Sequence, residues 1–135
     1  MKFRSTVLAS SLAIAALLVA TQASAACSYP KAPDKIPDGT KATKEEMIAG
    51  MKSMRAYNDM IKQYTDCLKS EHDAEVAKID SAPAGDDAAQ KKRKDQKDDL
   101  DKVLAQKNDA AVDEASAVTG RFNDQVKAYN AAHKS

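Results

Sequence analysis

Apolar side chains recur every three or four positions between residues 44 and 79. This spacing is typical of one face of an amphipathic helix. At the start of the stretch, the Thr43 side chain can accept from the third helical N–H while Glu46 reaches back to the Thr43 N–H, which is a capping box. The pattern therefore predicts a helix over 44–79. Its apolar face consists of Met47, Met51, Met54, Tyr57, Ile61, Tyr64 and Leu68.

A second amphipathic stretch covers residues 86–131 and contains no proline. Turn-forming residues at 81–85 end the first helix, and Asp86 suits the N-terminus of the second. The short loop, 80–85, favours an all-α fold in which two long helices form an antiparallel hairpin with coiled-coil-like packing, followed by a tail at 132–135. Counting back from this loop places Met54 opposite Val112. The corresponding stripe of the second helix, apolar except for Lys107, runs through Leu100, Leu104, Lys107, Ala111, Ala115, Val118, Phe122, Val126 and Tyr129.

The segment 27–43, called the arm below, has prolines at 30, 33 and 37 that favour extended backbone. The apolar stripe of the first helix is roughly 200° wide at about 100° per residue, which is too wide for one partner helix. Cys67 lies on the flank that the second helix leaves uncovered. We therefore expect the arm to fold back antiparallel along the first helix, with Ile36 and Tyr29 filling this flank.

Cys27 and Cys67 are the only cysteines of the chain. An even count in an exported chain favours a disulfide, since exported proteins meet an oxidising compartment. Closing this loop of roughly 40 residues should stabilise the fold by about 4 kcal/mol in the chain-entropy model. The alternative, a reactive or metal-binding thiol pair, has less support because there is no C-x-x-C motif and no histidine at ligand spacing.

The first 26 residues have the features of a targeting segment. Lys2 and Arg4 are followed by an apolar stretch at 7–20, and small residues suited to signal-peptidase cleavage stand at 23–25. The apolar stretch is shorter than the roughly 20 residues of a membrane span. The pattern predicts a cleaved signal peptide over 1–26, a periplasmic protein and no stable membrane span after cleavage. A lipoprotein acylated at Cys27 is an alternative, although Ser24 stands where a lipobox has a leucine-like residue.

Composition limits both the core and the class of partner. After cleavage, Leu, Ile, Val and Phe would make up 13 of 109 residues, too few for a large independent core. The whole chain has a formal net charge of +1, which gives no electrostatic case for nucleic-acid binding. The basic run 91–94 is followed by aspartates, so we interpret it as a self-compensated solvent face. A contact with an anionic envelope polymer remains an alternative.

Two groups of residues are candidates for chemistry. Met47, Met51 and Met54 could offer soft thioether ligands to Cu(I), although methionines at helical spacing usually fill a core. Residues 71–75 contain Glu71, His72 and Asp73, but adjacent positions do not converge on one helix face, so we expect them to be solvated. The chain has no Gly-rich phosphate loop and no Ser/His/Asp set. We therefore expect a protein that is not an enzyme and has no cofactor.

Several short motifs resemble those of small exported proteins of proteobacteria that have two cysteines and no known activity. The resemblance implies an envelope location and the two-cysteine pattern, and it implies no ligand or catalytic residue. It rests on residues 36–39 (IPDG), 43–47 (TKEEM), 107–114 (KNDAAVDE) and 122–129 (FNDQVKAY), together with Tyr64, Cys67 and Leu68.

Two functions follow as hypotheses. The first is a non-enzymatic structural or protein-interaction protein of the cell envelope, whose partner is another envelope protein or a second copy of the chain. The alternative is a small periplasmic carrier of copper or another ligand that uses the methionine face at Met47, Met51 and Met54.

Overall fold

The computed structural model describes residues 26–134 and contains two α-helices and no strand in that range. Helix α1 spans Lys44–Ser81 and helix α2 spans Asp87–Ala132. A disulfide joins Cys27 to Cys67. The predictions of an all-helical chain and of this disulfide are confirmed. The proposed signal peptide lies outside the described residues, except for Ala26.

Both helices begin at side-chain caps. Glu46 N donates to Thr43 Oγ1 (3.2 Å) and Thr43 N donates to Glu46 Oε2 (2.7 Å), so the capping box is formed. Asp86 Oδ1 accepts from Ala89 N (2.9 Å) at the start of α2. Helix α1 ends because Ala82 precedes a proline and adopts extended backbone, as residues before proline usually do.

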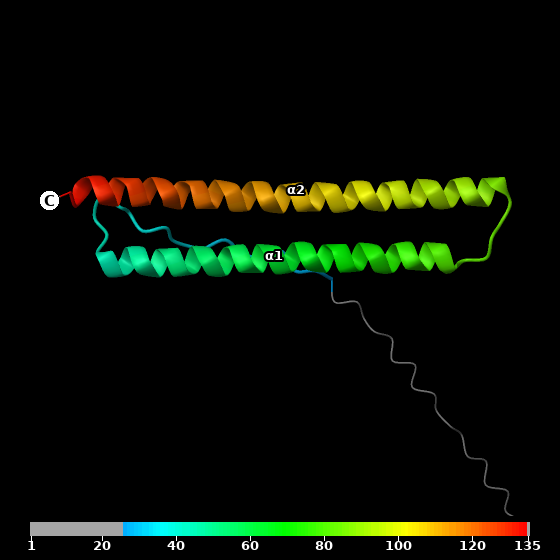
Figure 1. Cartoon of the computed structure of the whole chain (residues 1–135), viewed down its shortest axis with the longest axis horizontal. Coiled ribbons are helices and arrows are strands. Elements are labelled where there is room, and N and C mark those ends of the chain that lie inside the picture. The colour runs from blue at the N-terminus through cyan, green and yellow to red at the C-terminus, as the bar shows by residue number, and fades with distance from the viewer. Residues whose placement is uncertain (1–25, 135) are drawn as a thin grey trace, which may run out of the picture.

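The chain runs in one direction through α1 and returns alongside it through α2 (Figure 1). Two ionic contacts connect the helices: His72 Nε2 lies 2.7 Å from Asp101 Oδ1, and Lys97 pairs with Asp80. The register differs from the expected one. Val112, which the sequence placed opposite Met54, lines a groove together with Ile61 and Thr65, about two or three turns further along α1.

The shift in register arises at the loop between the helices. Figure 1 shows α2 extending past the end of α1, so the loop has to return along this overhang. Arg93 donates to the carbonyl oxygen of Pro83 and holds the loop against α2. The expected register, with Met54 opposite Val112, assumed that the two helices pair from the ends that adjoin the loop. Because α2 extends past the end of α1, they do not pair in this way.

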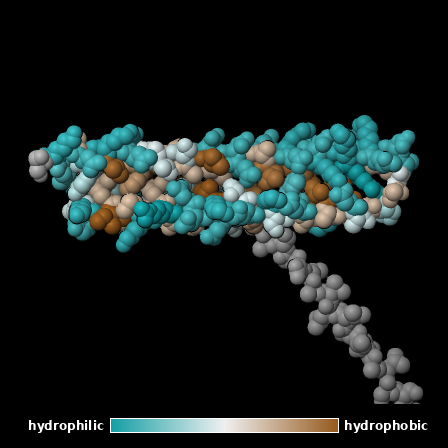
Figure 2. All heavy atoms as spheres, viewed as in Figure 1, coloured by the Kyte–Doolittle hydropathy of each residue, from teal (hydrophilic) through white to brown (hydrophobic). Residues whose placement is uncertain are grey.

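The buried core lies at the end of the molecule away from this loop. Tyr57 and Val118 are the largest fully buried side chains. The loop end, by contrast, is covered by hydrophilic side chains (Figure 2). The buried hydrophobic residues are Ala42, Met47, Met54, Tyr57, Ile61, Tyr64, Leu68, Ala111, Val118 and Phe122.

The arm lies along both helices, whereas the sequence predicted contacts with the first helix alone. Tyr29 packs edge-on against Tyr64 of α1, with 5.1 Å between ring centroids, but its ring remains exposed instead of filling the flank. Toward α2, Gly39 N donates to Gln125 Oε1 (2.8 Å). Ile36 is half-buried against the core, as expected.

Two glycines give opposite predictions for replacement by alanine. A Cβ at Gly50 would lie 2.8 Å from Pro37 Cγ and 2.9 Å from Phe122 Cε2, so the arm or α2 would have to move. A Cβ at Gly120 would meet nothing within 4 Å. Because alanine is the better helix former, Gly120→Ala should raise the free energy of unfolding by about 0.5–1 kcal/mol.

Urea denaturation of both variants, at low protein concentration, tests this expectation. Gly50→Ala should lower the free energy of unfolding, although its gain in helix propensity is the same. Equal effects of the two substitutions would show that the arm is not packed at Gly50.

Candidate functional site

The disulfide forms the junction between the arm and α1. Glu71 follows Cys67 by one helical turn, and its Oε1 accepts from Cys27 N (3.0 Å). The two sulfurs and the Glu71 carboxylate lie within 4.8 Å of one another. In this state the sulfurs are bonded to each other and are not thiolates, which are the metal-binding form of cysteine. The junction therefore acts as a structural cross-link.

A second polar contact holds the arm to α2. The Tyr29 hydroxyl donates to Glu114 Oε2 (2.7 Å). Removal from water, and then the hydrogen bond to Glu114, raise the pKa of Tyr29 above its usual value. Burial likewise raises the pKa of Tyr57, and the Glu114 charge adds to the effect. A general base or nucleophile would need the opposite shift toward neutral pH. The protonated Tyr29 hydroxyl therefore positions the arm on Glu114, whereas the buried Tyr57 hydroxyl has no hydrogen-bond partner among the described residues.

His72 bridges the two helices. Its Nε2 lies 2.7 Å from Asp101 Oδ1 and its Nδ1 lies 3.3 Å from Asp73 Oδ1, while the side chain is only 16% exposed. The expectation of a solvated 71–75 segment is therefore wrong for His72, and for Glu71, which binds the Cys27 N–H. Hydrogen bonds to Asp73 and then to Asp101 raise the pKa of His72. Lys69, and then His72, lower the pKa of Asp73.

This arrangement predicts a pH-dependent contribution to stability. Because the pKa of His72 is higher in the folded protein than its unfolded value of about 6.5, protonation favours folding. The contribution is fully present below that unfolded pKa and is lost as the pH rises through the raised folded pKa. Between mildly acidic and mildly basic pH, the wild type should lose more stability than His72→Gln.

Thermal unfolding at a series of pH values measures the difference. His133→Gln removes the other histidine of the chain and serves as the matched control. If His72→Gln has the same pH profile as the wild type and the control, the bridge to Asp101 is not formed in solution.

The methionines proposed for copper do not form a common exposed set. Met47 and Met54 are buried in the core. Met51 is 38% exposed, and its sulfur lies 3.8 Å from Arg55 Nη2. A metal ion would therefore have to draw two side chains out of the core and bind beside a guanidinium cation.

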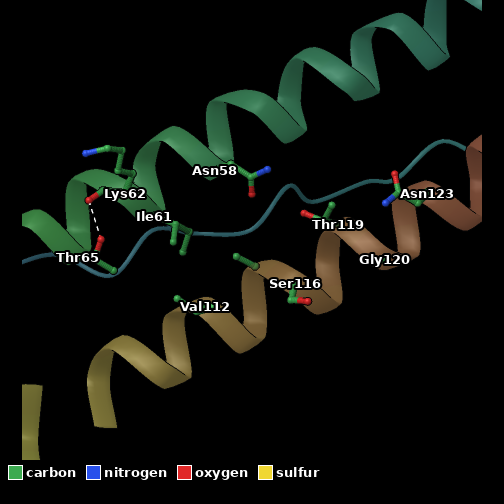
Figure 3. Close-up of a pocket in the computed structure, with 10 residues that line it drawn as sticks. Asn58, Ile61, Lys62, Thr65, Val112, Ser116, Thr119, Gly120 and Asn123 are labelled. Atoms are coloured by element: carbon green, nitrogen blue, oxygen red, sulfur yellow. Dashed lines mark hydrogen bonds between the residues drawn. The ribbon is translucent and has the colours of Figure 1, made fainter. Parts of the chain in front are cut away.

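A groove about 590 Å³ in volume lies between α1 and α2. Figure 3 shows Ile61 of α1 and Val112 of α2 on its two sides. Its one charged lining residue, Lys62, pairs with Asp66 (Nζ–Oδ2 2.6 Å). No arm residue lines it. The lining residues are Asn58, Ile61, Lys62, Thr65, Val112, Ala115, Ser116, Thr119, Gly120 and Asn123.

A second, smaller hollow of about 210 Å³ lies toward the start of α1 and is almost entirely apolar. We call the surface formed by the two hollows the open face. The sequence pattern did not predict this face, because α2 and the arm together were expected to cover the apolar stripe of α1. The residues of the second hollow are Lys44, Met47, Ile48, Met51, Phe122, Val126 and Tyr129.

No protein-family model, no curated protein and no solved structure matches the chain. Within the described residues, neither helix has an apolar stretch long enough to cross a membrane.

Proposed function

We propose that this chain is a non-enzymatic structural or protein-interaction protein of the cell envelope, built as an antiparallel helical hairpin with a disulfide-linked arm. The observation that carries the proposal is the Cys27–Cys67 disulfide, which joins the arm to the middle of α1. A protein with so small a core gains a large share of its stability from such a cross-link. The cross-link persists in oxidising compartments such as the periplasm.

The polar side chains that contact the arm support a structural function. Glu71 accepts from Cys27 N, Glu114 accepts from Tyr29, and Gln125 accepts from Gly39 N. Each of these side chains holds the arm in place and has no polar neighbour poised for acid–base chemistry among these contacts. Side chains of the open face, such as Val112 at 56% exposure, remain available for a partner.

The envelope location also draws on the targeting segment and on the resemblance to small exported proteobacterial proteins. If the proposal is correct, the full-length chain expressed in a Gram-negative host is recovered from the periplasm. Its intact mass should correspond to a start at Ala26 or Cys27 with one disulfide, and alkylation should require prior reduction. Cytoplasmic protein with free thiols, or Cys27 carrying a diacylglycerol, would contradict it.

The proposed interaction with a partner protein needs a separate test. A photo-crosslinking amino acid at position 112, on the open face, should give a discrete adduct in the periplasm. The same group at position 133, at the end of α2, should not. Absence of any adduct at several open-face positions would leave a structural protein without a docking surface.

The copper alternative makes its own prediction. Because Met47 and Met54 lie in the core, Cu(I) titration of the oxidised protein against a competing chelator should show no binding tighter than about micromolar. Tighter binding that is lost in Met51→Leu would favour the carrier over the interaction protein.

A further inference from the structure

We infer that Asp38–Gly39 is a site of isoaspartate formation, at which the contact between the arm and α2 holds back a rearrangement of the backbone. In this reaction the Gly39 nitrogen attacks Cγ of the Asp38 side chain, the nitrogen loses its proton, and water leaves as the ring closes to a succinimide. Water then opens the ring, and opening at the main-chain carbonyl of Asp38 gives isoaspartate. The mass of the chain is unchanged, and water is the one co-reactant.

The sequence contains one step at which this reaction is favoured. Asp38–Gly39 is the one Asp–Gly pair of the chain, and there is no Asn–Gly pair. A glycine after the aspartate leaves the attacking nitrogen unhindered by a side chain, and it gives the backbone the widest choice of conformations. In an unfolded chain this step is therefore the most reactive of the aspartate steps.

The packing of the arm explains why a glycine stands at this position. Gly39 is buried against α2, near the C-terminal end of that helix (Figure 1). A Cβ at Gly39 would overlap the carbonyl oxygen of Gln125 and lie 2.8 Å from Tyr129 N. Both atoms belong to the backbone of α2 and cannot turn aside as a flexible side chain can. The docked arm therefore requires the residue that also makes Asp38 reactive.

The folded protein engages both reacting groups in other hydrogen bonds. The Gly39 N–H donates to Gln125 Oε1 (2.8 Å), so the attacking nitrogen is held toward α2. The Asp38 Oδ1 atom accepts from Thr40 N (3.0 Å) and from Thr40 Oγ1 (2.7 Å). The main-chain oxygen of Asp38 accepts from Ala42 N (2.7 Å). Ring closure has to break this arrangement, so the arm must first open locally.

The turn at 38–42 also makes the carboxyl group a poorer electrophile. The Thr40 hydroxyl, and then the Thr40 N–H, lower the pKa of Asp38. Water leaves readily from a carboxylic acid but not from a carboxylate, so the ring closes through the protonated form. A lowered pKa makes this form scarcer at neutral pH than it is in an unfolded chain. Thr40 therefore opposes the reaction independently of Gln125.

Isoaspartate at position 38 would prevent the arm from docking again. The rearrangement brings Cβ of Asp38 into the main chain and turns the former main-chain carbonyl into a carboxylate. The main chain before Gly39 is then one atom longer, and the oxygen that accepts from Ala42 N is displaced from the turn. A temporary release of the arm, such as reduction of the Cys27–Cys67 disulfide would cause, thereby becomes permanent.

Electron-transfer mass spectrometry distinguishes isoaspartate from aspartate by the backbone fragments and tests the inference on the oxidised, processed protein. A synthetic peptide of residues 34–43 gives the rate without protection. At neutral pH, position 38 of the wild type should isomerise at least about tenfold more slowly than the peptide. Gln125→Met keeps a side chain of similar length without the acceptor and should accelerate the reaction about fivefold.

Asn123→Ala is the matched control, since Asn123 also lies on α2 but lines the groove, where there is no arm residue. The control should isomerise like the wild type, and circular dichroism should show equal helix content in both variants. Reduction of the disulfide should bring the wild type toward the rate of the peptide. A wild type that isomerises as fast as the peptide would overturn the inference without reference to any variant. A peptide that forms no isoaspartate, or no acceleration by either Gln125→Met or reduction, would also overturn it.

Discussion

Reduction of the Cys27–Cys67 disulfide should lower the thermal unfolding midpoint by about 15 °C or more. The cross-link closes a loop with a sequence separation of 40 residues, which is worth about 4 kcal/mol in the chain-entropy model. In a domain of this size, each kcal/mol shifts the midpoint by about 4–8 °C. Scanning calorimetry with and without a phosphine reductant measures the change.

The double variant Cys27→Ser/Cys67→Ser is the control for this prediction. It should unfold near the midpoint of the reduced wild type, and the reductant should not change it further. An unchanged midpoint after complete reduction of the wild type would show that the arm contributes little to stability, contrary to its contacts with Tyr64, Glu114 and Gln125.

Amides of residues 72–97, which we call the tip, should exchange with solvent about a hundredfold faster than those of 50–66 and 103–125. All buried hydrophobic residues lie between 42 and 68 or between 111 and 122. The tip is held by ion pairs such as Lys91–Asp95 and Lys97–Asp80. Exposed helix pairs of this kind contribute only about 0.2–0.5 kcal/mol each, so the tip should open without global unfolding.

Hydrogen exchange followed by mass spectrometry resolves these segments. Raising the salt concentration should accelerate exchange in the tip selectively, because exposed ion pairs are screened. Equal protection of the tip and of 50–66 would mean that the tip is covered by another molecule.

Local signals were sufficient to predict both helices and their caps. The Thr43–Glu46 capping box is formed, and α1 continues two residues beyond the predicted 79 before the extended Ala82. These features depend on side chains within a few residues of one another. The disulfide was predicted for a comparable reason, because only one pairing of two cysteines exists.

Features that depend on contacts between distant segments were less predictable. The register between the helices depends on the overhang of α2, which Arg93 supports through Pro83, and nothing in a Pro-Ala-Gly loop specifies it. His72 was expected to be solvated because Asp101, its partner, lies 29 positions away on the other helix. No local signal marks Glu114 as the acceptor of the Tyr29 hydroxyl, because the two residues are 85 positions apart.

The open face could not be predicted for a third reason. Helical arithmetic gave the width of the apolar stripe on α1, but not the side on which the arm would lie. The arm contacts Glu114 and Gln125 of α2, which leaves the side bearing Val112 uncovered. A hollow between two helices depends on their relative rotation, and small residues such as Ser116 and Thr119 carry little signal for it.

A nuclear Overhauser spectrum of the oxidised protein tests the central claim most directly, since that claim is an arm held across two antiparallel helices. We predict cross-peaks between the rings of Tyr29 and Tyr64, and between Pro37 and Phe122, which both border the Cβ position of Gly50. Contacts between Ile61 and Ala115 should join the helices across the groove. A helical spectrum without these cross-peaks, or with cross-peaks between Met54 and Val112 instead, would contradict the account.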